Sequence, residues 1–154
     1  MVINNRRPNI TLLGLSVGVE DSGLSEWRTE TTRDLGEAKA ALESAAKSLS
    51  GEATAAQVRS VWAAYARIEK SIAFIRLEIE EENPGRFIPL GRYAVPDERQ
   101  AIQFALKRLS KGTDSFALGD FRLALKDLRD ARNYLRAFLR RERLKRVRKG
   151  RVRS

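Results

Sequence analysis

The sequence contains no cysteine and no histidine among its 154 residues. The absence of cysteine excludes disulfides, thiolate metal sites and cysteine nucleophiles. The absence of histidine removes the most common general base and the most common metal ligand. The glycines also lack the spacing of a phosphate-binding loop, and no motif supplies a group to activate serine or threonine. We therefore expect a protein that is not an enzyme and that uses no cofactor and no metal.

Long apolar runs are lacking as well. No segment approaches the roughly 20 consecutive apolar residues that a membrane-spanning helix needs, and the first residues do not have the pattern of a secretory signal. We expect a cytoplasmic protein without a membrane partner. Arginine outnumbers lysine by 22 to 8. Together with the scarcity of cysteine, histidine and methionine, this ratio is compatible with a thermophilic origin.

Apolar residues recur at steps of three and four in four segments, the pattern of amphipathic helices. The first is expected from Ser25 to about Ser50. The second opens at Thr54 with a capping-box sequence and ends before Pro84. A third is expected from Pro96 to a stop at Gly112, and a fourth begins near Ser115 or Asp120. The second helix carries an additional apolar face, formed by Trp62, Ala66, Ala73 and Leu77, and two apolar faces predict a central helix that contacts more than one partner.

These segments predict an all-α fold, an antiparallel four-helix bundle of two helical hairpins over residues 25–139. Residues 1–24 are expected to form an extended N-terminal arm, because apolar residues alternate with small or polar ones from Leu13 to Val19. The arm could lie over its own core. The alternative is that residues 10–19 exchange between subunits and produce a homo-oligomer.

The positive charge is concentrated at the C-terminal end. Residues 1–77 and residues 78–139 each carry a net charge of +1, whereas residues 140–154 hold nine Lys/Arg and one Asp/Glu, giving +8. The last segment is therefore expected to be a basic C-terminal extension. Its arginines suit phosphate, because a planar guanidinium can donate two hydrogen bonds at once.

The apolar stripe of the fourth helix ends at Leu139, while a basic stripe beside it continues. We expect this helix to leave the bundle and to present cations that have no partner within the chain. The candidate nucleic-acid-binding residues are Arg122, Lys126, Arg129, Arg136, Arg140, Arg141, Arg143, Lys145, Arg146, Arg148, Lys149, Arg151 and Arg153.

A polyanion is the partner that best accounts for so many cations, because each phosphate contact releases counterions and adds affinity. The sequence therefore predicts a sequence-independent nucleic-acid or nucleoprotein-binding protein and does not distinguish DNA from RNA. No aromatic residue follows Phe138, so we expect no base stacking by the extension. The alternative is a structural or adaptor protein that oligomerises through its N-terminal arm and binds an acidic protein partner with its basic tail.

Overall fold

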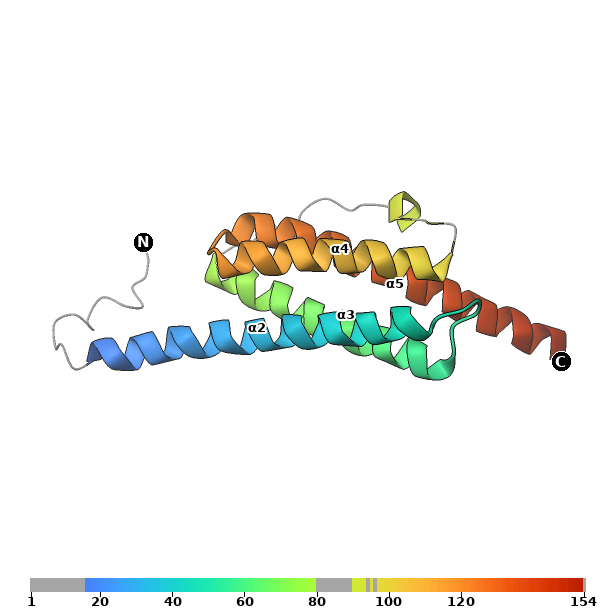
Figure 1. Ribbon diagram of the computed structural model, residues 1–154, viewed down its shortest axis with the longest axis horizontal. Helices are drawn as coiled ribbons and strands as arrows, with labels where there is room; N and C mark the ends of the chain where they lie inside the picture. Colours follow the sequence, from blue (N-terminus) through green and yellow to red (C-terminus); the bar gives the residue numbers. More distant parts are fainter. Residues whose placement is uncertain (1–15, 80–89, 94, 96, 154) are drawn as a thin grey trace.

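The computed structural model describes residues 16–79, 90–93, 95 and 97–153. Four long α-helices and one short 3-10 helix make up this part of the chain, which contains no strand. In chain order they are α2 (Ser16–Ser48), α3 (Ala55–Glu78), η1 (Leu90–Tyr93), α4 (Glu98–Ala117) and α5 (Phe121–Arg153). The prediction of an all-α helical bundle is confirmed (Figure 1).

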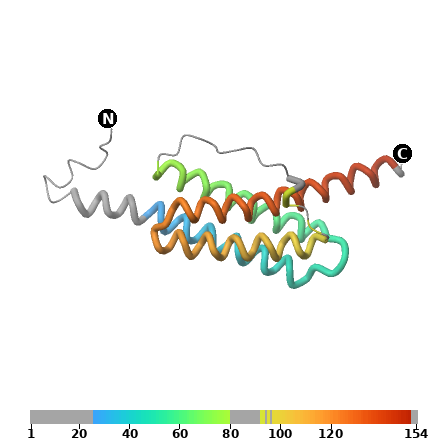
Figure 2. The backbone as a smooth tube through the Cα atoms, turned by 90° about the horizontal axis from the view of Figure 1, so that it is seen from above, coloured from blue at the N-terminus to red at the C-terminus, as the bar shows by residue number. Residues whose placement is uncertain are grey.

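The helices form two hairpins, α2–α3 and α4–α5, which pack against each other through the pairs α3–α5 and α2–α4 (Figures 1 and 2). Contacts along the α2–α3 seam join Gln57 to Ser48 and Arg67 to Asp34. The residue number therefore rises on one helix as it falls on the other, and the two helices run in opposite directions. The hairpins enclose one core, and each helix turns one apolar face towards it.

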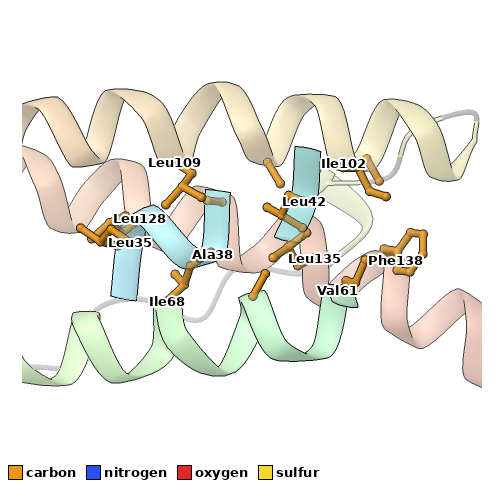
Figure 3. Close-up of a cluster of buried hydrophobic side chains, with 14 of the residues drawn as sticks. Leu35, Ala38, Leu42, Val61, Ile68, Ile102, Leu109, Leu128, Leu135 and Phe138 are labelled. Carbon is orange, nitrogen blue, oxygen red and sulfur yellow. The ribbon is translucent and has the colours of Figure 1, made fainter. Parts of the chain in front are cut away.

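The core lies along the middle of the four helices, where their apolar stripes meet (Figure 3). Leu35, Ile68, Ile102 and Leu135, one from each helix, are fully buried. At one end, the partly buried indole of Trp27 contacts two phenylalanine rings at centroid distances of 5.6 and 5.8 Å. None of the described helices combines the length and the apolar character needed to cross a membrane.

The N-terminal ends of α3 and α4 are each stabilised by a capping residue. Thr54 Oγ1 accepts a hydrogen bond from the backbone N–H of Gln57 at 3.2 Å, and the Gln57 side chain accepts one from the N–H of Thr54 at 2.8 Å. This reciprocal pair is the predicted capping box, and it is confirmed. Asp97 caps α4 by accepting from the N–H of Gln100 at 2.8 Å. The far end of α3 lies at Glu78, earlier than the expected end near Pro84.

The prediction that Gly112 ends its helix is wrong. Helix α4 continues to Ala117, and the turn to α5 uses Gly119, whose φ of +82° favours glycine. Gly112 instead lies at the contact between α4 and α5. A Cβ atom at this position would lie 2.8 Å from Leu128 Cδ2 and 2.9 Å from Leu128 Cγ. The glycine therefore permits a close approach of the two helices.

The expected extended arm is also wrong over residues 16–24. Helix α2 begins at Ser16, so the expected boundary between residues 24 and 25 falls inside it. A run of seven residues is too short to separate a period of two from the helical period of 3.6, and the helix already includes the second half of the alternating run. Residues 1–15 lie outside the described part of the chain. They include residues 10–15 of the segment 10–19 that was expected to exchange between subunits.

Candidate nucleic-acid interface

Helix α5 carries all of the candidate residues. Its 33 residues correspond to a rod about 50 Å long at the ordinary rise of about 1.5 Å per residue. One face is buried against α3 and α4, while most of the basic stripe is exposed. The C-terminal turns continue past the loop that joins α2 to α3 (Figures 1 and 2).

Seven of the thirteen candidates share two properties. They are exposed, and none of them lies within ion-pair distance of a carboxylate belonging to the described residues. These residues, hereafter the free α5 cations, are Arg122, Lys126, Arg136, Arg140, Arg143, Arg146 and Arg148. They extend along most of the helix, so the arrangement offers many exposed guanidinium and ammonium groups to a polyanion.

A second group of candidates contacts the start of α4. The carboxylate of Glu98, which is 6% exposed, accepts a hydrogen bond from Lys145 Nζ. Arg141 donates to the backbone carbonyl of Val95 at 2.8 Å, and its Nη2 lies 3.9 Å from Glu98 Oε1. These contacts fasten the α5 segment beyond Leu139 to the start of α4.

The charged side chains in this group shift one another's pKa values. Burial raises the pKa of Glu98, but the hydrogen bond from Lys145 and the positive charges of Lys145 and Arg141 outweigh it, so the pKa lies below its ordinary value. The hydrogen bond to Glu98 raises the pKa of Lys145. Both residues are therefore charged throughout the neutral pH range.

The expectation that every cation beyond Leu139 lacks a partner in the chain is therefore wrong. Glu142, which is 7% exposed, occupies the core-facing position one turn after Leu139, and its Oε2 lies 3.2 Å from Lys145 Nζ. Lys149 Nζ lies 3.4 Å from Glu52 in the loop between α2 and α3. The register of the buried face thus continues past Leu139 with charged pairs in place of apolar contacts.

The three remaining candidates do not join the free α5 cations. Arg129 is half-buried, and Arg129 and Arg151 each take part in an electrostatic or hydrogen-bond interaction. Arg153 is the last residue of α5, and its side chain lies outside the described part of the structure. The candidate set therefore divides into three residues that fasten α5 to the bundle, the seven free α5 cations, and these three.

A groove of about 550 Å³ lies between α3 and α5. Val58 and Leu139 contribute apolar surface to it, and Trp62 and Tyr65 contribute aromatic rings. Its cationic border consists of four of the free α5 cations, namely Arg136, Arg140, Arg143 and Arg146, and Glu142 also lines it. The groove therefore combines an apolar and aromatic floor with a positively charged border.

The aromatic part of this groove was not predicted. Trp62 belongs to the additional apolar face of α3, from which we expected this helix to contact more than one partner. Helix α3 does contact two partners, α2 and α5, but not through this face, because Trp62 is 54% exposed and Leu77 is 71% exposed. The signal in the sequence was a tryptophan outside the core stripe, but only the packing of α3 on α5 places it beside the arginines. Trp62 on α3 is thus a candidate for base stacking, which the extension cannot provide because it has no aromatic residue.

Comparisons of this chain with protein families, with curated proteins and with solved structures found no match.

Proposed function

We propose that this protein binds nucleic acid without sequence specificity, through phosphate contacts made by the free α5 cations. The observation that carries the proposal is their combination of exposure and absence of described carboxylate partners. A row of like charges along one helix repels itself, and a polyanion relieves that repulsion while releasing its own counterions. Phosphate contacts of this kind do not read base sequence.

The division of the cations supports this proposal. Arg141, Lys145 and Lys149 already interact with carboxylates or backbone of the same chain, so they account for the attachment of α5. No such structural role accounts for the exposed cations. A helix dipole favours cations only within its last turn, whereas Arg122 and Lys126 lie in the first two turns of α5. Their position is therefore explained better by an external anion.

The test is the salt dependence of binding to duplex DNA. If all seven free α5 cations contact phosphates, the slope of log K against log salt should be about −6, at about −0.9 per contact. Replacing all seven by glutamine should abolish binding at physiological salt. The matched control replaces seven exposed cations elsewhere, again by glutamine, and so gives the same net charge: Arg33, Lys39, Lys47, Arg59, Arg99, Lys107 and Lys111.

The two variants distinguish a local interface from a general effect of charge. The proposal requires the control variant to keep a slope within about one contact of the original, at about 0.9 per contact. Equal losses in both variants would show that net charge alone drives binding. A slope near zero for the unmodified chain would overturn the proposal and would favour the alternative, an adaptor that binds an acidic protein.

A further inference from the structure

The groove between α3 and α5 joins arginines to an exposed indole, and this combination selects one class of nucleic acid. We propose that the groove binds single-stranded nucleic acid, with a base stacked on Trp62 and the adjacent phosphates held by the arginines of α5. The inference rests on the proposed function and adds the kind of strand that the protein prefers.

The aromatic surface of the groove is exposed to solvent, and its two rings lie in a defined orientation to each other. Trp62 is 54% exposed, and its ring meets that of Tyr65 edge to face, with centroids 5.6 Å apart and planes at 84°. Val58, Trp62 and Tyr65 follow one another at steps of four and three, so they lie on one face of α3. That face meets Leu139 of α5 across the groove. A flat ring placed here would cover apolar surface that the bundle itself leaves exposed.

The charge around the groove suits a phosphate backbone. Four arginines border it, and the one carboxylate that lines it, Glu142, lies 3.2 Å from Lys145. From Arg136 to Arg146 the helix rises about 15 Å at about 1.5 Å per residue. That length matches roughly four nucleotides at about 3.4 Å per stacked nucleotide. The arginines can therefore follow the backbone of a short segment while a base occupies the floor.

A single strand fits these features better than a duplex does. In a duplex each base is stacked on both faces and is paired, so a base reaches an external ring only after it is extruded from the helix. In a single strand, aromatic side chains can stack with bases of any sequence, and stacking combines with cationic grooves that follow the backbone. An acidic peptide would satisfy the arginines, but only nucleic acid brings an aromatic ring and an anion in every unit.

The experiment compares dodecathymidylate with a 12-base-pair duplex, using the full chain in both cases. Trp62→Ala should weaken binding of the single strand by about tenfold, since loss of one base–aromatic stack costs 1–3 kcal/mol. It should change duplex binding by less than twofold. Trp62→Phe, which retains a ring, should recover most of the affinity. Leu77→Ala is the matched control, because it removes an exposed apolar side chain of α3 outside the groove.

Fluorescence provides an independent measurement. The chain has two tryptophans, and Trp27 is packed against Phe116 and Phe121. Stacking should quench Trp62, so the single strand should reduce the emission of the unmodified chain but not that of Trp62→Phe. Thermal unfolding of each variant checks that the bundle remains intact, as expected for a side chain that is more than half exposed.

The outcomes separate this inference from the proposed function. If Trp62→Ala leaves single-strand affinity unchanged while neutralising the free α5 cations abolishes binding, the inference is overturned and the proposed function stands. If no nucleic acid binds the unmodified chain, both are overturned. Tighter binding of a tyrosine-containing polyglutamate peptide than of the single strand, with the same loss in Trp62→Ala, would assign the groove to an acidic protein and overturn the inference.

Discussion

Replacing Gly112 with alanine should destabilise the bundle, although alanine is the better helix former. Gly112 lies in the interior of α4, where a change from glycine to alanine ordinarily stabilises a protein by about 0.5–1 kcal/mol. The added methyl group would lie 2.8 Å from Leu128 Cδ2 and 2.9 Å from Leu128 Cγ, and 3.4 Å from the carbonyl oxygen of Ala124. Steric contact and helix propensity therefore act in opposite directions.

The steric contact should be the larger of the two. Leu128 is fully buried, so its side chain has no solvent-facing position to which it can move. Inserting a methylene-sized group into a well-packed core costs typically 1–3 kcal/mol. After subtraction of the gain in helix propensity, we expect a net loss of about 1 kcal/mol for Gly112→Ala. For a chain of this length, that loss corresponds to a melting temperature lower by about 2–4 °C.

Gly36 provides the matched control for this prediction. It also lies in a helix, it is exposed, and a Cβ atom there would meet nothing within 4 Å. Gly36→Ala should therefore raise the free energy of unfolding by about 0.5–1 kcal/mol. Urea unfolding of both variants, followed by circular dichroism, measures the two effects. Each comparison assumes an unchanged m-value, which the same data verify.

A second substitution tests whether Leu128 is the cause. In a chain that already carries Leu128→Ala, Gly112→Ala should become stabilising, because the steric contact has been removed. The two substitutions should therefore show a coupling energy in a double-mutant cycle. If Gly112→Ala is as stabilising as Gly36→Ala in the unmodified chain, the reasoning from the close approach of α4 and α5 is refuted.

Three further predictions follow from the polar contacts. Glu98→Gln should lower stability by about 1–2 kcal/mol at neutral pH through loss of the charged hydrogen bond from Lys145. Because the pKa of Glu98 is lowered, its contribution is present above the unfolded value of 4.5 and is lost as the pH falls below it, so unfolding curves of the variant and the unmodified chain should converge in acid. Thr54→Ala should lower the urea midpoint, with a loss of about 1 kcal/mol from the capping box. Tyr93→Phe removes the hydrogen bond to Asp130 at 2.9 Å and should cost about 0.5–1.5 kcal/mol in the same assay, with no change in secondary structure.

The sequence is sufficient to predict those features that depend on neighbouring residues along one helix. Apolar stripes reveal the four helices, because burial on one face imposes a helical period on the sequence. Leu35, Ile68, Ile102 and Leu135 belong to these stripes, one on each helix. The capping box at Thr54 is equally local, since its donor and acceptor are three residues apart. In both cases the pattern and the interaction that it reports belong to the same short segment.

Features that join distant segments could not be predicted in this way. A glycine near the end of an apolar stripe can stop a helix or admit a neighbouring helix, and for Gly112 the deciding group is Leu128 on α5. Likewise, Lys145 looks like any other cation of the extension until α4 places Glu98 beside it. In the sequence Trp62 is a tryptophan beside the core stripe of its helix, and it becomes part of a groove only through the packing of α3 on α5.

The attachment of α5 has a consequence for how a polyanion would bind. The paired cations Arg141 and Lys145 contact the start of α4, whereas Arg136, Arg143 and Arg146 line the groove between α3 and α5. A phosphate backbone in that groove would therefore not compete with Glu98 for its partners. The ion pairs hold the helix in place, so the arginines are already arranged before binding, and less conformational entropy is lost when a ligand binds. Glu98→Gln should accordingly weaken nucleic-acid binding only through the altered position of α5, and the loss should be smaller than that caused by neutralising the groove arginines.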